Sequence, residues 1–162
     1  MKSITSLNLN DSSVWLFLLA VVVAVIFMVT TKKWALGLLT GYTLVILGET
    51  VLLRVPSSGQ HFQPQLFWSY RVWNVEKGQI IANILAFVPL GFLAGCLWKW
   101  KGIIAGIVLS MAIELLQLLS QRGLCEFDDI LHNTLGTLIG VSIYMLVETA
   151  VKKKGNNNGL QK

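Results

Sequence analysis

The stretch IIANILAFVPLGFLAGCLW, residues 80–98, contains no Asp, Glu, Lys or Arg. A helix that crosses the hydrocarbon core of a bilayer, about 30 Å thick, needs about 20 mostly apolar residues. Four further mostly apolar runs occur, at residues 14–30, 34–53, 102–120 and 130–147, and two of them contain a single Glu. The chain is therefore predicted to be an all-α, polytopic membrane helix bundle of about five transmembrane helices.

The composition of the whole chain supports this interpretation. Apolar residues make up 54% and charged residues 13% of the 162 residues, whereas a soluble domain carries about 25% charged residues. Because Lys32 and Lys33 follow the first run and no small-residue cleavage site does, we interpret that run as an uncleaved anchor. The net charge of +5 is attributed to lysines at loop ends that contact anionic lipids, since no nucleic-acid motif is present.

The orientation follows from the Lys and Arg residues of the short loops, because the side that carries more of them is cytoplasmic. With five spans, eight fall on the side of the carboxyl terminus and five on the other side. We therefore expect residues 1–13 outside, residues 14–147 in the membrane, and residues 148–162 as a basic, polar cytoplasmic tail. Within that tail, residues 152–159 are predicted to be unstructured.

Polar residues interrupt the apolar runs close to their outer ends. Glu49 lies near the end of the second run, Asn83 one turn into the third, and Glu114 about two turns before the end of the fourth. A charged side chain inside a membrane costs about 3 kcal/mol or more, so it is a functional-site candidate. These three residues point to a polar site near the outer face.

Two polar stripes extend this pattern, each with residues three or four positions apart and hence on one helix face. They are Ser110, Glu114, Gln117 and Gln121 in the fourth run and Asp129, Asn133 and Thr137 in the fifth. Because the linker 121–128 is short, the two helices are predicted to be antiparallel neighbours. Both stripes should then meet near the outer surface, beside Arg122.

Four glycine pairs with a spacing of four residues predict close helix packing. They are Gly37 with Gly41, Gly91 with Gly95, Gly102 with Gly106, and Gly136 with Gly140. The aromatic segment at residues 60–74 is predicted to lie in the head-group region. It is either a lid over the polar cluster or an aromatic belt that only fixes helix depth.

Three motifs, in this order, resemble the VanZ-like family of membrane proteins. Residues 83–92, NILAFVPLGF, resemble the N-x-x-x-F-x-P-x-G segment of the family. Residues 114–117, ELLQ, resemble its E-x-x-Q helix. Residues 128–136, DDILHNTLG, resemble the start of its D-x-x-x-N-T-x-G helix. Arg122 and residues 50–54 and 67–70 match further family features, so the resemblance covers about residues 50–140.

The resemblance implies a multi-pass protein of the bacterial cytoplasmic membrane. The founding member is associated with resistance to teicoplanin, a lipid-bearing glycopeptide antibiotic. Many members have four spans, so the additional amino-terminal span of this chain is a departure from the family pattern. The family has no settled biochemistry, and the resemblance therefore implies a location and a context but no reaction.

We expect the protein to contribute to glycopeptide resistance by binding an amphipathic molecule in an outward-facing polar pocket. The molecule would be a lipid-linked cell-wall precursor or a lipoglycopeptide. The candidate ligand-binding residues are Glu49, Arg54, Arg71, Asn83, Glu114, Gln117, Arg122, Asp128, Asp129 and Asn133. The arginines could bind phosphate, because guanidinium presents a bidentate donor fork, and the acids and amides could bind sugar or peptide groups.

Two alternatives remain open. In the first, the protein is an intramembrane enzyme that modifies or hydrolyses a lipid-linked substrate, with Glu114 and Asp129 as acid and base. Against this alternative, the sequence contains no H-E-x-x-H, G-x-S-x-G or Cys–His pattern. Metal binding by Glu114, Asp128, Asp129 and His132 belongs to this alternative, although no cofactor is expected. In the second, the polar residues form only an interhelical hydrogen-bond network. Membrane lipids are expected partners, and homo-oligomerisation is compatible with the sequence.

Overall fold

The computed structural model of the protein describes residues 11–56 and 58–159, which are mostly helical. The elements, in chain order, are α1 (Asp11–Thr31), α2 (Trp34–Leu47), a π-helical turn η1 (Gly48–Leu52), β1 (Phe62–Gln63), α3 (Trp68–Arg71), α4 (Trp73–Trp98), a 3-10 turn η2 (Lys99–Lys101), α5 (Gly102–Ser120), β2 (Cys125–Glu126) and α6 (Phe127–Gly159). Residues 1–10 of the predicted amino-terminal segment lie outside the described residues.

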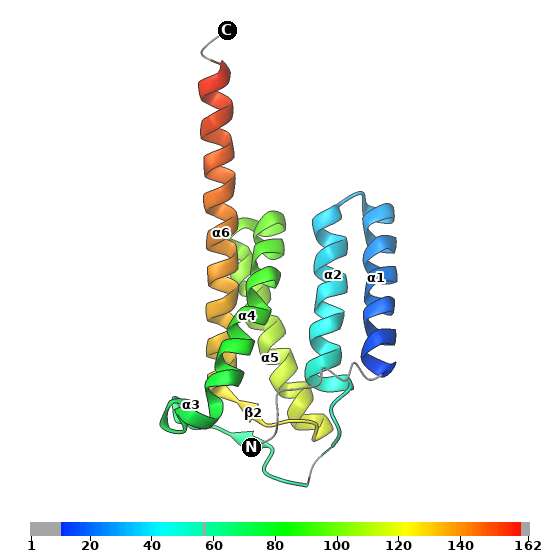
Figure 1. The fold of residues 1–162 in the computed structure, drawn as a ribbon, viewed down its shortest axis with the longest axis vertical. Coiled ribbons are helices and arrows are strands. Elements are labelled where there is room, and N and C mark those ends of the chain that lie inside the picture. The colour runs from blue at the N-terminus through cyan, green and yellow to red at the C-terminus, as the bar shows by residue number, and fades with distance from the viewer. Residues whose placement is uncertain (1–10, 57, 160–162) are drawn as a thin grey trace.

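Within the described part of the chain, four continuous helical stretches are long and apolar enough to cross a membrane. They are Ser12–Thr31, Trp34–Leu52, Trp73–Ser120 and Phe127–Lys154. The third stretch contains α4 and α5, and the chain reverses its direction between them at η2 (Figure 1). The stretches make five passes, so the predicted all-α membrane bundle of about five helices is confirmed.

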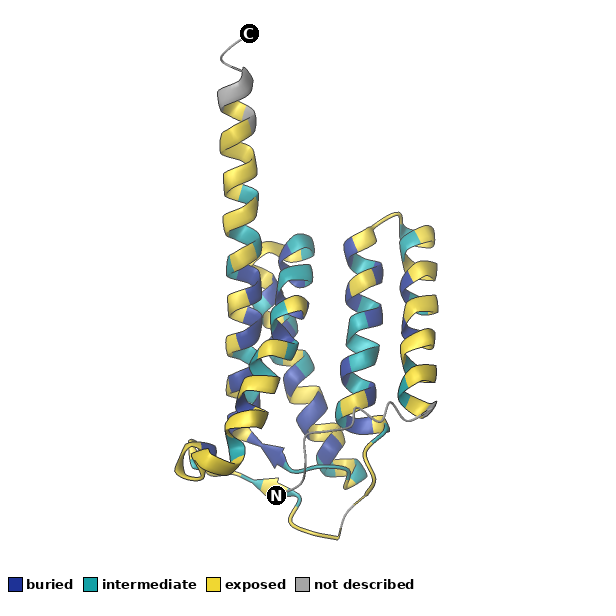
Figure 2. Ribbon diagram, in the orientation of Figure 1, coloured by how far each residue is buried: buried dark blue, intermediate teal, exposed yellow. Residues whose placement is uncertain are grey.

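The outer faces of these helices remain apolar and exposed. Only 11% of the most apolar window of α1 is buried inside the protein, and exposed residues follow the outside of the bundle (Figure 2). Because burial of apolar surface is the main driving force of folding in water, these faces require lipid as their surroundings.

The helices form two groups, a hairpin of α1 and α2 and a three-helix group of α4, α5 and α6 (Figure 1). In the second group α4 and α6 pack with their backbones in contact. A Cβ atom at Gly91 would collide with the backbone of Thr137, and one at Gly136 would collide with the carbonyl of Ile84. The glycine pair of α2 lies against the backbone of α1 in the same way. The close packing predicted from these glycine pairs is therefore confirmed.

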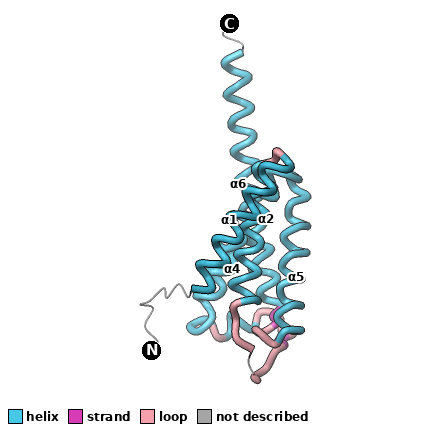
Figure 3. Tube along the Cα trace, turned by 90° about the vertical axis from the view of Figure 1, so that its right-hand side faces the viewer, coloured by secondary structure: helices cyan, strands magenta, loops and turns pink. Residues whose placement is uncertain are grey.

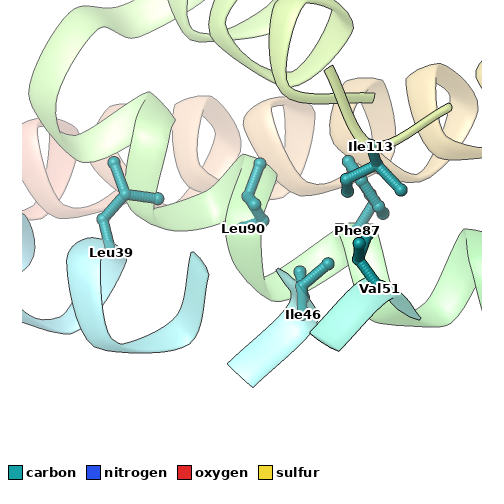
Figure 4. Packing of buried hydrophobic residues seen from close by; sticks show 6 residues of the cluster. All are labelled: Leu39, Ile46, Val51, Phe87, Leu90 and Ile113. Atoms are coloured by element: carbon teal, nitrogen blue, oxygen red, sulfur yellow. The ribbon is translucent and has the colours of Figure 1, made fainter. Parts of the chain in front are cut away.

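A small apolar core joins the two groups. Its six buried side chains come from α2, η1, α4 and α5, and they are Leu39, Ile46, Val51, Phe87, Leu90 and Ile113 (Figure 4). Three of them, Ile46, Phe87 and Ile113, also line the cavity described below. The core therefore fixes the position of the helices that carry the site.

The two longest helices extend beyond their apolar runs. Helix α4 begins at Trp73, before the predicted span, and α6 continues to Gly159 and projects past the other helices (Figure 3). The prediction that residues 152–159 are unstructured is therefore wrong. A helix that is already nucleated adds one hydrogen bond per further residue, and the ion pair between Glu148 and Lys152, one turn apart, supports the extension.

Candidate functional site

A cavity of about 190 Å³ lies among α2, η1, α4, α5 and α6. Seven of the predicted ligand-binding residues line it. They are Glu49, Arg54, Asn83, Glu114, Gln117, Asp129 and Asn133. The polar stripes of α5 and α6 therefore meet at one site, together with polar residues from α2–η1 and α4.

The stripe of α5 is tied to two other elements. Glu114 and Gln117 are buried one turn apart, with 2% and 3% of their surface exposed. Oε2 of Glu114 accepts a hydrogen bond from the backbone N–H of Glu126 at 2.8 Å. Nε2 of Gln117 donates to the carbonyl of Thr50 at 3.1 Å, and Thr50 lies in the π-helical turn η1. Such turns are frequent at functional sites.

The stripe of α6 is tied to α4 and α5. Nδ2 of Asn133 donates to Oγ of Ser110 at 2.9 Å. One oxygen of Asp129 accepts a hydrogen bond from Nε2 of Gln79 at 3.2 Å. These contacts hold the polar side chains of three helices in a fixed arrangement around the cavity.

Two buried oxygen atoms at the cavity have no hydrogen-bond partner within residues 11–56 and 58–159. They are Oε1 of Gln117 and Oδ1 of Asn133. A buried polar atom without a partner costs about 1–3 kcal/mol, and buried polar atoms in native proteins are paired in the large majority of cases. The free oxygens therefore point to a molecule that enters the cavity and donates hydrogen bonds.

The aromatic segment is attached to the start of α6. Strand β1 pairs in parallel with β2, so that Phe62 lies opposite Cys125. The carboxylate of Asp128 accepts hydrogen bonds from the backbone N–H groups of Phe67 and Ser69 and from the Ser69 hydroxyl. In addition, Nε1 of Trp68 donates to Glu126 at 2.8 Å, and the Tyr70 hydroxyl lies 3.0 Å from Nε2 of His132. We call these contacts the α6 clamp.

Neither of the two predicted roles describes the aromatic segment completely. Among the described residues, none from 60–74 lines the cavity, so the segment is no lid directly over it. The segment is also more than a belt that fixes depth, since the α6 clamp holds it through buried polar groups. The clamp instead positions the first two turns of α6, which carry Asp129 and Asn133 at the cavity.

The α6 clamp contains a carboxyl group with altered proton affinity. Glu126 is 4% exposed and precedes the membrane-spanning part of α6. Burial raises the pKa of Glu126 to about 7, the nearby charge of Asp129 raises it as well, and the hydrogen bond from Trp68 opposes this change. The clamp therefore contains a group that titrates near neutral pH.

Three predicted ligand-binding residues do not line the cavity. Asp128 belongs to the α6 clamp, and Arg71 is exposed at the end of α3. Arg122 donates to the carbonyl of Leu52 at 2.6 Å and lies at a different surface hollow. The reason is local: Gln121, which ends α5, has a φ of 56°, and this left-handed residue turns the chain away from the line of the α5 stripe.

The candidate metal ligands are separated in the same way. The described residues contain no group of three or more His, Cys, Asp or Glu side chains placed to hold a metal ion. Glu114 and Asp129 line the cavity, whereas Asp128 and His132 bind residues of the aromatic segment. The structure thus brings two of the four proposed ligands to the site.

Two polar residues of the cavity, Tyr42 and Thr50, are not among the residues predicted from the sequence. Tyr42 lies seven residues before Glu49 and therefore on the same face of α2. The hydroxyl of Tyr42 donates to the carbonyl of Ala86 at 2.9 Å, which ties α2 to α4 beside the cavity. The spacing of Tyr42 from Glu49 was the signal that could have revealed it.

Comparisons with known proteins agree with the motifs. A family model described as VanZ/LLP1 matches residues 14–148, which include every residue that lines the cavity. Protein VanZ of Enterococcus faecium is 28% identical over 80 residues, and the match covers 47% of this chain and 50% of that protein. The chain therefore matches about half the length of this curated relative. No solved structure matches the chain.

Proposed function

Since the chain belongs to the VanZ/LLP1 family, we propose that it is a bacterial cell-envelope protein that binds the polar head of an amphipathic molecule in its cavity. Through this binding the protein contributes to resistance against teicoplanin-type glycopeptides. The observation that carries the proposal is a cavity with buried, unpaired acceptor atoms inside a bundle whose outer surface is apolar. A polar site of this kind is expensive in a membrane protein and calls for a ligand.

The size of the cavity limits what it can hold. A volume of about 190 Å³ equals the share of about six water molecules in the liquid, and sites for drug-sized ligands have about 300–1,000 Å³. A whole lipoglycopeptide is too large to enter. The small head group of a membrane lipid, with its chains left in the bilayer, matches the volume. A lipid-linked cell-wall precursor, whose head is a pyrophosphate with sugars and a peptide, can place only one end of that head in the cavity.

The placement of charge supports a cavity that opens outward. The lysine-rich ends of the helices, at Lys32–Lys33, Lys99–Lys101 and Lys152–Lys154, lie opposite the end that carries β1, β2 and α3 (Figure 1). The cavity lies toward the latter end, because its residues come from the last turns of α2 and α5 and the first turns of α6. The excess of lysines would place the lysine-rich end in the cytoplasm, so the end that carries the cavity would face the outside.

Filling the cavity tests this proposal. The side chain of Ala86 lines the cavity without a polar role, and Ala86→Phe should reduce the affinity of purified protein for a lipid-linked cell-wall precursor at least about tenfold. Ala112→Phe is the matched control, because Ala112 is exposed on α5 and does not line the cavity. The affinities of the wild type, Ala86→Phe and Ala112→Phe are measured by native mass spectrometry in detergent. Equal affinities of all three would refute the proposal.

The link to resistance needs a second measurement. Cells that carry the wild type, Ala86→Phe or Ala112→Phe at equal membrane levels should differ in the inhibitory concentration of teicoplanin. Only the cavity-filling variant should lose protection. If all three protect equally, the cavity has no part in resistance.

The enzyme alternative uses the same cavity, because Glu114 and Asp129 both line it. Two carboxyl groups at one site can act as acid and base when their surroundings separate their proton affinities. Mass spectra of the precursor after incubation with the protein distinguish the two functions. Conversion that stops in Glu114→Gln would favour the enzyme, and an unchanged precursor would favour binding.

A further inference from the structure

We infer that the ligand is a lipid whose head group carries a protonated primary amine next to a phosphate. This inference rests on the proposed binding of an amphipathic molecule by its polar head, and it names as that molecule an amine-bearing phospholipid in place of a cell-wall precursor. It follows from the hydrogen-bonding character of the cavity, which presents acceptor atoms in its interior and a cation at its edge.

Two buried amides that line the cavity each leave one oxygen atom without a hydrogen-bond partner among the described residues. The NH₂ group of Gln117 donates to the backbone carbonyl of Thr50, which can only accept, so the opposite orientation of this amide would bring two oxygens together. Nδ2 of Asn133 lies 2.9 Å from Oγ of Ser110, and because a hydroxyl can donate as well as accept, only the orientation of Gln117 is fixed by its partner. Gln117 and Asn133 are only 3% and 4% exposed, and the oxygen atom of each has no partner within the described residues.

Three carboxyl groups line the same cavity, those of Glu49, Glu114 and Asp129, and the last two are buried. Glu114 and Asp129 are 2% and 8% exposed. Each uses one oxygen for a hydrogen bond within the protein, Glu114 with the backbone N–H of Glu126 and Asp129 with Gln79. The other oxygen of Asp129 lies 3.8 Å from Nδ1 of His132, which is beyond hydrogen-bond distance. The second oxygen of each carboxyl group is therefore left for a ligand, and it accepts a hydrogen bond when the group is ionised.

A primary ammonium group matches this arrangement better than a hydroxyl or a phosphate. It has three donors, no acceptor and a positive charge, and its hydrogen bonds to carboxylates are about twice as strong as neutral ones. A phosphate offers only acceptors and negative charge, so the buried part of the cavity would repel it. A quaternary ammonium has the charge but no N–H group.

The edge of the cavity carries one charged side chain of each sign, because Glu49 and Arg54 both line the cavity and are exposed. Arg54 is exposed, and among the described residues that line the cavity it is the one cationic side chain. Guanidinium binds phosphate with two parallel hydrogen bonds. A head group with an ammonium followed by a phosphate would therefore place the ammonium inside and the phosphate at Arg54.

An apolar cavity continues the site toward the lipid. It has a volume of about 390 Å³, and its lining consists of Ser13, Val14, Leu16, Phe17, Val45 and Glu49. Val45 and Glu49 also line the polar cavity, so the two are neighbours. This cavity lies on α1 and α2, which face the bilayer, and it can receive an acyl chain whose head group occupies the polar cavity.

The test compares three short-chain lipids that differ only in the head group. Dihexanoyl phosphatidylethanolamine has a primary ammonium, phosphatidylcholine a quaternary one, and phosphatidylglycerol has hydroxyls and no amine. Titration calorimetry on the full chain in detergent should show at least about tenfold tighter binding of the first lipid, since hydrogen bonds to charged groups contribute that much. Equal binding of the ethanolamine and choline lipids would overturn the inference.

Variants assign the effect to the cavity. Asn133→Leu removes one of the free oxygens and should reduce the preference for ethanolamine over choline several-fold, whereas Asn133→Asp, which keeps acceptor atoms, should retain it. Arg54→Gln should lower the affinity for the ethanolamine and the choline lipid alike, because both lipids carry the phosphate. Arg71→Gln, outside the cavity, should change neither affinity. An unchanged preference in folded Asn133→Leu would contradict the assignment. If that variant does not fold, the lipid series on the wild type decides.

The outcomes separate this inference from the proposed function. If a lipid-linked saccharide binds in a way that Ala86→Phe abolishes, and the ethanolamine lipid shows no preference, the proposed function stands and the ammonium inference fails. If Ala86→Phe changes the binding of no amphiphile, both fail. Preferential ethanolamine binding that Ala86→Phe abolishes supports the inference and the proposed binding of a polar head group in the cavity, and it replaces the cell-wall precursor as the ligand.

Discussion

Replacement of Asp128 by Asn should detach the aromatic segment from the start of α6. Asp128 is fully buried, and its two oxygens accept three hydrogen bonds: from the backbone N–H of Phe67 at 2.6 Å, from the backbone N–H of Ser69 at 3.0 Å and from the Ser69 hydroxyl at 2.6 Å. Asparagine has one side-chain oxygen, and its NH₂ group would face an N–H donor. The variant therefore loses at least one of these bonds and weakens the others.

The size of the effect follows from the bonds that are lost. A hydrogen bond to a charged group contributes about 1.5–3 kcal/mol, and a neutral one about 1 kcal/mol. Asp128→Asn should thus lower the local stability of the segment by about 3 kcal/mol, which raises the detached fraction about 100-fold. Ser69→Ala removes only the hydroxyl bond and should raise it about tenfold.

Hydrogen exchange measures this fraction directly, because the backbone N–H groups of Phe67 and Ser69 are themselves donors to Asp128. Relative to the wild type, the exchange of these two amides should be about tenfold faster in Ser69→Ala and about 100-fold faster in Asp128→Asn. Glu148→Gln, with the same change of charge near the other end of the membrane-spanning part of α6, should leave their exchange unchanged. Wild-type exchange rates at both amides in folded Asp128→Asn would refute the reasoning.

Three further predictions concern the titration, the packing and the orientation of the protein. Since the pKa of Glu126 is raised from 4.5 to about 7, the folded state binds its proton more tightly, and the stability present below pH 4.5 should be lost as the pH rises through 7. The thermal midpoint of Glu126→Gln in detergent should vary less over this interval, and an equal slope would speak against the assignment. Gly136→Ile should lower the free energy of unfolding by about 3 kcal/mol or more, because the new side chain would enter the space of the Ile84 carbonyl. Gly78→Ala, with no atom near its Cβ, should be neutral or stabilising by up to about 1 kcal/mol. Similar thermal midpoints of the two variants would disprove the packing argument. Alkaline phosphatase fused to the carboxyl end should be inactive and a fluorescent protein at the same place should fluoresce, and the reverse result would invert the proposed orientation.

The membrane bundle and much of its polar lining could be predicted from the sequence, because both depend on local patterns. The length of an apolar run is compared with a bilayer thickness that is the same for all proteins. The spacing of Glu114 and Gln117, or of Asp129 and Asn133, places each pair on one helix face whatever the rest of the chain does. The glycine pairs likewise mark the contact faces of α4 and α6 by their spacing alone.

Only the tertiary structure decided which charged side chains enter the cavity and what their polar atoms do there. Arg54 lines it and Arg122 does not, because one left-handed residue at Gln121 changes the direction of the chain after α5. Asp128 and Asp129 are neighbours in sequence, but one holds the aromatic segment and the other lines the cavity. Adjacent residues on a helix point in directions about 100° apart, since a turn takes 3.6 residues. The partners of Asp128 and Asp129 are therefore set by the elements that pack around α6. The periodicity of the sequence does not indicate which elements these are.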